Sequence, residues 1–255
     1  MDKNERLFKI LDVLRSEGNA STKYLANLLD VSEATIRRDL KNLSEEDTFP
    51  VNRVHGGIIY SLEKIGSEPM FDIKLSQKVE EKKKIAKFAA DLVDDRDTII
   101  LDSGTTCYYL ARELVRKKGL KIVCVDIKVA GELAKYPTIQ TILIGGEIRP
   151  GYFSIGGEMG VRCLNEIQAE KGFIATDGWN LNGSYNSSTF EVGVKKAIIN
   201  NSLKTYLITD ITKYGKVALI KVADLDQLDG LIINKPLQED VINALKQRNI
   251  EVFLV

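Results

Sequence analysis

Apolar positions at the start of the chain recur with the spacing of α-helices. In residues 3–16, apolar side chains fall at i, i+3, i+4 and i+7, which predicts a helix with one apolar stripe. Ser21 can cap a second helix, and Ser32 can cap a third helix over residues 33–43. A short turn separates the last two helices. Three short helices in this order are typical of the helix-turn-helix motif.

The segment DTFPVNRVHGGIIY, residues 47–60, follows the third helix. Its apolar residues alternate around a proline and a glycine pair, which predicts a small β-ribbon, or wing. Clear periodicity is lost over residues 58–76, which we interpret as a linker. The sequence therefore predicts a winged helix-turn-helix domain over 1–57, a linker over 58–76 and a second domain over 77–255.

The pattern changes in the second domain, where short apolar segments alternate with helical ones. Strands are predicted at 98–102, 121–125, 139–144, 171–176, 204–210, 230–234 and 250–255, and helices at 79–93, 105–117, 127–135, 191–201 and 238–248. Strands that alternate with helices indicate an α/β domain with a mostly parallel sheet. The expected fold class is thus a small α+β winged helix-turn-helix domain followed by a larger α/β domain.

The amino-acid composition argues against several classes of protein. The chain has 36 Lys and Arg and 36 Asp and Glu, so bulk charge argues neither for nor against nucleic acid. No apolar run approaches the ~20 residues of a membrane span, and the start does not resemble a signal peptide. Three scattered cysteines and one histidine leave little room for a metal site or a Ser-His-acid triad. We expect a cytoplasmic protein with reduced thiols, no metal and no cofactor.

The third helix carries the candidate chemistry of the first domain. Its apolar residues Ile36, Leu40 and Leu43 face inward. Small and basic residues therefore face outward, where a capped helix can enter a major groove. A solvated basic face is the alternative, but the concentration of basic residues on this helix and the wing favours DNA. The candidate DNA contacts are Ser32, Ala34, Thr35, Arg37, Arg38, Lys41, Arg53 and His55.

Candidate ligand residues of the second domain follow its predicted strands. In LDSGTT, residues 101–106, backbone N–H groups and hydroxyls at a helix start can hold a phosphate, although neither a P-loop nor a GxGxxG motif is present. Further clusters follow other predicted strands: Gly145, Gly146 and Arg149 in GGEIRP, Asp177 and Glu191 in the segment after strand 171–176, and Lys213 in DITKYG. Each of these clusters, taken alone, could be only a tight turn or a surface charge. Together, at the carboxyl ends of parallel strands, they favour a ligand site. The candidates are Asp102, Ser103, Gly104, Thr105, Thr106, Gly145, Gly146, Arg149, Asp177, Glu191 and Lys213.

Several segments resemble the DeoR family of bacterial transcriptional regulators. VSEATIRRDLKNL followed by RVHGG resembles its DNA-binding domain, and LDSGTT, GGEIR, EVGVKKAII and DITKYG resemble its effector domain. Two segments depart from the family pattern. SEEDTFPVN stands where relatives usually have a glycine-bearing turn, and CVDIKVA stands where most have a Thr-Asn-Ser stretch.

The resemblance implies binding to double-stranded operator DNA and a C-terminal fold similar to ribose-5-phosphate isomerase that senses a phosphorylated sugar. It further implies that residues 103–106 hold the phosphate with help from Lys213. Asp102, Asp177 and Glu191 would face the sugar.

An isomerase-like enzyme fused to a DNA-binding domain is the alternative. In the isomerases a lysine and a run of glycines precede the catalytic glutamate, whereas residues 185–189 here read Tyr-Asn-Ser-Ser-Thr. We therefore predict a protein that is not an enzyme but a regulator, a repressor of a sugar-utilisation operon. A single small DNA-binding domain rarely binds its operator tightly enough, so we expect a homodimer or homotetramer on repeated half-sites.

Overall fold

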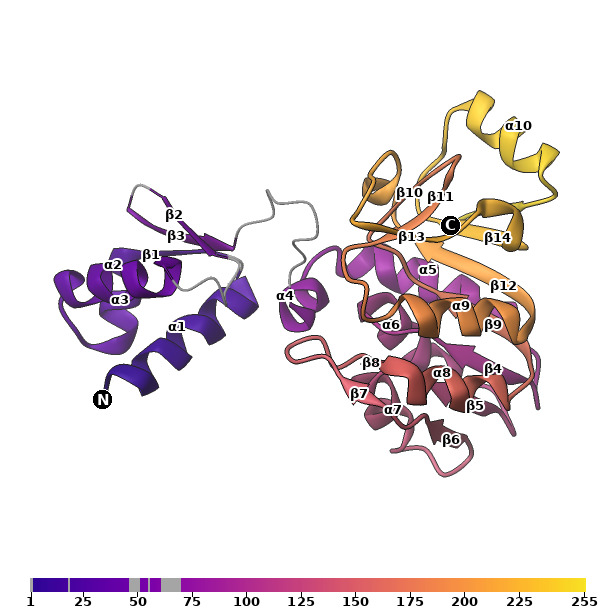
Figure 1. The fold of residues 1–255 in the computed structure, drawn as a ribbon, viewed down its shortest axis with the longest axis horizontal. Coiled ribbons are helices and arrows are strands. Elements are labelled where there is room, and N and C mark those ends of the chain that lie inside the picture. The colour runs from indigo at the N-terminus through magenta and orange to yellow at the C-terminus, as the bar shows by residue number, and fades with distance from the viewer. Residues whose placement is uncertain (1, 18, 46–50, 55, 61–69) are drawn as a thin grey trace. The chain divides into compact units, whose positions relative to one another are not determined.

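The chain divides into two compact units, Met1–Gln77 (unit 1) and Lys78–Val255 (unit 2), in the computed structural model (Figure 1). The residues that the structure describes are 2–17, 19–45, 51–54, 56–60 and 70–255. Among these residues, no helix is long and apolar enough to cross a membrane.

Unit 1 combines helices with a small antiparallel sheet. Its elements are α1 (Lys3–Glu17), β1 (Asn19–Ser21), α2 (Thr22–Leu29), α3 (Glu33–Glu45), β2 (Val51–Val54), β3 (Gly57–Tyr60) and α4 (Phe71–Ser76), and the sheet order is β1-β3-β2. The side chain of Ser21 accepts a hydrogen bond from Tyr24 N–H at 3.0 Å, which confirms the predicted cap of α2. The predicted inner face of α3 is also confirmed, because Ile36, Leu40 and Leu43 are all buried.

Two elements of unit 1 differ from the prediction. Strand β1 was missed because three residues are too few to show a period; it pairs with β3 in the register Ala20–Ile58. The predicted linker over 58–76 is wrong at both ends, since β3 extends to residue 60 and α4 begins at Phe71. Phe71 is buried and α4 packs against α1, so tertiary packing, rather than any repeated pattern, forms this six-residue helix.

Unit 2 is built on a seven-stranded sheet in the order β15-β14-β12-β9-β4-β5-β6, and every neighbouring pair is parallel. The strands are β4 (Thr98–Leu101), β5 (Lys121–Cys124), β6 (Gln140–Leu143), β9 (Ala169–Ile174), β12 (Ser202–Thr209), β14 (Gly230–Ile233) and β15 (Glu251–Leu254). The helices are α5 (Val79–Asp91), α6 (Thr105–Leu114), α7 (Ile127–Leu133), α8 (Gly157–Asn165), α9 (Val192–Asn200) and α10 (Glu239–Gln247). The predicted fold class is thus confirmed.

Unit 2 also contains elements that the sequence did not predict. Helix α8 was missed because it begins at Gly157, with a φ of +81°, and contains Gly160; glycine is a poor helix former. At Gly160 a Cβ would lie 3.3 Å from both Ile144 and Val194, so the glycine permits close packing of the helix. The short strands β7 (Glu147–Ile148) and β8 (Ile155–Gly156) form a hairpin, and β10 (Gly178–Asn180), β11 (Gly183–Asn186) and β13 (Ile220–Ala223) form a separate antiparallel sheet.

The sheet order places the candidate site. Strands β4 and β9 are central neighbours, with β5 beside β4 and β12 beside β9. Because all four run parallel, the residues after their carboxyl ends meet at one edge of the sheet. These residues include Asp102 after β4, Asp126 after β5 and Ala175 after β9.

Candidate functional site

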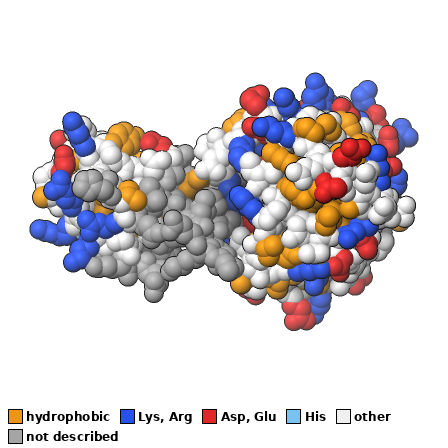
Figure 2. All heavy atoms as spheres, turned by 90° about the horizontal axis from the view of Figure 1, so that it is seen from above, with side chains coloured by type: hydrophobic (Ala, Val, Ile, Leu, Met, Phe, Trp, Pro, Cys, Tyr) orange, Lys and Arg blue, Asp and Glu red, His pale blue; other side chains and the backbone are white. Residues whose placement is uncertain are grey.

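The exposed face of α3 carries most of the predicted DNA contacts. Ser32, Ala34, Arg37, Arg38 and Lys41 are exposed, and Thr35 is half-buried. Figure 2 shows Lys and Arg side chains gathered on part of the surface of unit 1. Arg37 forms an ion pair with Glu33 one turn earlier, with an N–O distance of 3.0 Å. Exposed pairs of this kind are weak, so Arg37 can leave Glu33 at little cost when another anion approaches.

Ser32 and Thr35 also close the start of α3. The Ser32 hydroxyl accepts from Thr35 N–H at 3.2 Å, and the two hydroxyl oxygens are 2.9 Å apart. Both residues therefore stabilise the helix that presents the basic side chains.

A buried ion pair that the sequence did not predict fixes α3 against α1. Asp39 on α3 is 2% exposed and accepts two hydrogen bonds from the Arg6 guanidinium, at 2.5 and 3.2 Å. The hydrogen bond from Arg6 to Asp39 raises the pKa of the guanidinium. A bidentate pair of this kind sets the orientation of one helix on the other.

The wing contributes one described candidate. Arg53 is exposed on β2, whereas His55 lies outside the residues that the structure describes.

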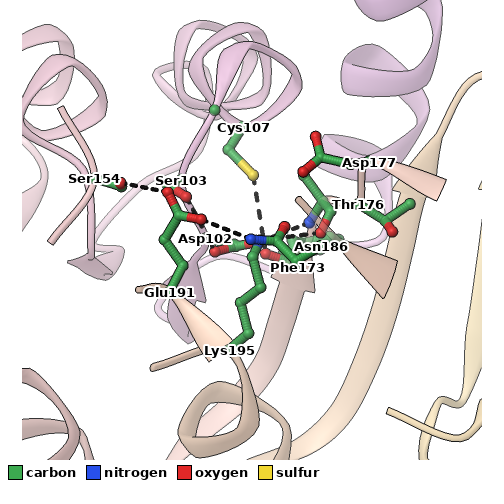
Figure 3. A network of polar contacts seen from close by, with 12 residues as sticks. Asp102, Ser103, Cys107, Ser154, Phe173, Thr176, Asp177, Asn186, Glu191 and Lys195 are labelled. Atoms are coloured by element: carbon green, nitrogen blue, oxygen red, sulfur yellow. Dashed lines mark hydrogen bonds and ion pairs between the residues drawn. The ribbon is translucent and has the colours of Figure 1, made fainter. Parts of the chain in front are cut away.

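A buried ion pair between Asp102 and Lys195 forms the centre of the candidate site in unit 2 (Figure 3). Asp102 follows β4 and also accepts from Ala175 N–H at 2.9 Å, while Lys195 on α9 donates to Ala175 O at 3.1 Å. Burial alone would lower the pKa of Lys195, but the carboxylates of Asp102 and Glu191 raise it. Lys195 is therefore a fixed positive charge that joins β4, β9 and α9.

Glu191 lies one turn before Lys195 and is also buried. Its Oε1 accepts from Arg149 Nη1 at 3.0 Å and from Ser154 Oγ at 2.6 Å, and its Oε2 accepts from Asn186 Nδ2 at 2.7 Å. Burial alone would raise the pKa of this carboxyl, but Lys195 and Arg149 lower it. The loop between β7 and β8 is thus tied to α9 through Glu191.

Residues 103–106, called loop 103–106 below, comprise the turn after β4 and the first two residues of α6. Gly104 is the N-cap of α6, with a φ of +100°, and a Cβ there would meet no atom within 4 Å. Ser103 and Thr105 are buried and Thr106 is half-buried. Gly104 N–H donates to Asp126 Oδ2 at 3.1 Å, so a carboxylate of this chain already contacts the start of α6.

Asp177 lies between β9 and β10 and is half-buried. Its Oδ2 accepts from Ser187 N–H at 2.8 Å, and its charge also raises the pKa of Lys195. The structure therefore brings Asp102, Asp177 and Glu191 together around Lys195.

Gly146 and Lys213 are two further predicted effector residues, outside the hydrogen bonds described above. At Gly146 a Cβ would collide with Gly156 O at 2.6 Å, so close backbone packing accounts for a glycine there. Lys213 ends the short 3-10 helix Ile211–Lys213. The neighbouring carboxylate of Asp210 pairs with Lys78 at 3.2 Å, a contact that the sequence did not predict.

Comparison with known proteins identifies the family. Residues 6–63 match the DeoR-like helix-turn-helix domain, and residues 77–235 match the DeoR C-terminal sensor domain. The chain belongs to the DeoR family. This DeoR-family protein is a DNA-binding transcriptional regulator with a sensor domain, as the sequence predicted.

Named relatives of this regulator match along almost their whole length. An uncharacterized HTH-type transcriptional regulator of Haemophilus influenzae is 35% identical, covering 98% of this chain and 97% of the relative. The glycerol-3-phosphate regulon repressor of Escherichia coli is 30% identical over the full length of both chains. Among solved structures, ribose 5-phosphate isomerase A from Methanocaldococcus jannaschii is 17% identical over 54% of this chain and 55% of that chain, with a TM-score of 0.40.

Several residues of the regulator's site were missed in the sequence. Lys195 falls four residues after Glu191, and this spacing places two side chains on one face of a helix. The sequence therefore contained enough information to place Lys195 beside Glu191. Ser154 lies in the loop between β7 and β8 and Asn186 lies on β11; the sequence predicted none of these strands, so neither residue gave such a signal. Among the described residues, no group of three or more His, Cys, Asp or Glu could hold a metal ion.

Proposed function

We propose that this regulator acts in the cytoplasm as a repressor of a sugar-utilisation operon and is controlled by a phosphorylated sugar bound in unit 2. The observation that carries the proposal is the convergence of Asp102, Asp177, Glu191 and Lys195 beside the start of α6. Buried, oriented carboxylates are suited to sugar hydroxyls, and a helix start is suited to a phosphate.

Operator binding is assigned to α3 and the wing. The exposed Arg37, Arg38 and Lys41 lie on one face of a helix that is capped at its start and braced from behind by Arg6 and Asp39. Such a helix can contact base edges and phosphates in a major groove. We propose a homodimer or homotetramer, which would read two or more half-sites.

Effector binding is assigned to loop 103–106 and the carboxylates around Lys195. Backbone N–H groups at the start of α6 and the hydroxyls of Thr105 and Thr106 would hold the phosphate, with Lys213 and Arg149 as further cations. One relative is named as a repressor of a glycerol-3-phosphate regulon, and that compound is a phosphorylated polyol. Phosphorylated sugars and polyols are therefore the compounds to test.

Binding without turnover is part of the proposal. The lysine that precedes the catalytic glutamate in the isomerases has no counterpart at residues 185–189, and Lys195 is held by Asp102. Incubation with ribose 5-phosphate and similar sugars should give no product, and turnover at rates usual for enzymes would support the isomerase alternative instead.

The test measures operator affinity with and without effector. Labelled DNA from upstream of the regulator's own gene and neighbouring operons is titrated with the full chain by fluorescence anisotropy. A panel of sugar phosphates and the matching free sugars is then added. We expect one phosphorylated compound to change the affinity by roughly 5–150-fold, whereas its unphosphorylated form does not. If no compound changes the affinity, or if the free sugar acts equally well, the sensor proposal is wrong.

A further inference from the structure

Asp126 already occupies the start of α6 in the effector site. Its Oδ2 accepts from Gly104 N–H at 3.1 Å, while its Oδ1 accepts from the N–H groups of Lys128 and Val129 at 2.8 and 3.1 Å. The carboxylate therefore joins the starts of α6 and α7, where the helix dipoles favour negative charge. In this chain, the place of an anion at α6 is partly taken by the protein itself.

The space in front of the loop is open. A Cβ at Gly104 would meet no atom within 4 Å, and Gly104 is only half-buried. An anionic group that enters this space competes with Asp126 for the Gly104 N–H. It also brings a second negative charge close to a buried one, which disfavours the ionised carboxylate.

We propose that Asp126 couples the binding of an anionic effector at loop 103–106 to the uptake of one proton from solvent. This inference rests on the proposed sensor function of unit 2. As the anion binds, the proton attaches to Asp126 Oδ2 and the Gly104 N–H turns from Oδ2 to an oxygen of the effector. Oδ1 keeps the N–H groups of Lys128 and Val129, so the cap of α7 is retained.

The surroundings of Asp126 make this protonation accessible. Its side chain is fully buried, and burial raises the pKa of the carboxyl to about 6, against the effect of its backbone hydrogen bonds. The charge of Asp102 contributes to this rise, after burial. The charge of Asp126 also acts on Cys107 on α6 and Cys124 on β5, but burial raises the pKa of both thiols, so they stay neutral.

Several cations of this region have partners other than Asp126, and Arg149 is one of them through its ion pair with Glu191. Lys195 pairs with Asp102, and Lys128 places its Nζ 4.4 Å from the centre of the Phe153 ring. Within the described part of the chain, no Lys or Arg forms an ion pair with Asp126. A solvent proton is therefore the available means of neutralising this carboxylate when a second anion arrives.

Sulfate is the probe for the experiment, because its charge does not change between pH 5 and 9. The ¹⁵N-labelled full chain is titrated with sodium sulfate at constant ionic strength, and the shift of the Gly104 amide is followed by NMR at several pH values. In the wild type, we expect the dissociation constant to rise by up to about tenfold for each pH unit above about pH 6. In Asp126→Asn it should stay within about twofold over the same range. Asp224→Asn, which alters an exposed capping carboxylate of unit 2, is the matched control and should behave as the wild type.

A second measurement does not depend on the variant folding. The ¹³C-labelled Asp126 carboxyl of the wild type is titrated with and without sulfate, and its pKa should be higher with sulfate present. The proposal is overturned if this pKa does not move, if Asp126→Asn keeps the wild-type pH dependence, or if sulfate leaves the Gly104 amide unchanged at every pH. A pH-independent sulfate site would leave the sensor function intact. Failure of every sugar phosphate to alter operator affinity would reject the sensor function and any regulatory role of the proton uptake, whereas the sulfate titration tests the proton uptake itself.

Discussion

Replacement of Lys195 by methionine should be among the most destabilising single changes in unit 2. The side chains of Lys195 and Asp102 are 4% and 1% exposed, and methionine keeps the length of the lysine while removing its charge. Asp102 would be left as a buried carboxylate without its cation, and breaking a buried pair in this way costs about 3–5 kcal/mol. Lys196→Met, at the exposed neighbouring position, is the control and should change the free energy of unfolding by about 0.5 kcal/mol or less.

Urea unfolding followed by tryptophan emission measures the effect. Trp179 is the single tryptophan of the chain and is fully buried in unit 2, so its emission reports on that unit. The double variant Asp102→Asn/Lys195→Met removes both charges, and we expect it to recover about 1–3 kcal/mol relative to the sum of the single changes. A cost for Lys195→Met below about 1 kcal/mol, or strict additivity in the double variant, would show that this pair does not stabilise the unit.

Three further predictions concern the two functions and the division of the chain. Arg37→Ala or Arg38→Ala should weaken operator binding by about 1–3 kcal/mol where the lost contact is bidentate to a guanine, and wild-type affinity of both variants in gel-shift titrations would mean that α3 is not the reading helix. Thr105→Val and Lys213→Ala should leave operator affinity unchanged without effector but remove the effector response in anisotropy titrations. A full response in Thr105→Val would contradict the role of loop 103–106. The fragment 78–255 should unfold cooperatively by itself, as a melt followed by circular dichroism would test, and a broad transition would argue against this boundary.

The sequence predicted the elements whose side-chain pattern repeats. Helices α1 to α3 show a clear helical period, and the parallel strands stand out as short apolar runs between helices. Strand β1 and the β10–β11 hairpin are too short or too polar to show a period. Helix α8 was not predicted because its glycines are poor helix formers. These elements form through pairing and packing with parts of the chain far away in sequence.

The sequence predicted the loops of the candidate site but not the ion pairs and hydrogen bonds that join them. Asp102 was selected because it follows a strand, whereas its partner Lys195 lies 93 residues later on a helix. A single sequence carries no information on which distant cation meets a given carboxylate. Asp126 was noticed only as a departure from the family pattern. Its contact with Gly104 depends on the parallel neighbours β4 and β5, which bring the two loops together.

The charges of the site also support binding over catalysis. Proton abstraction from a sugar carbon requires a base with a pKa near the working pH and a free oxygen directed at the substrate. Glu191 has a lowered pKa, and its two oxygens already accept from Arg149, Ser154 and Asn186. Lys195, the cation that could stabilise an enediolate, is buried against Asp102. Activating either group would require breaking hydrogen bonds that hold α9 to its surroundings. An effector that rearranges these same bonds would instead move α9 and the β7–β8 loop, which is the kind of response that a sensor domain needs.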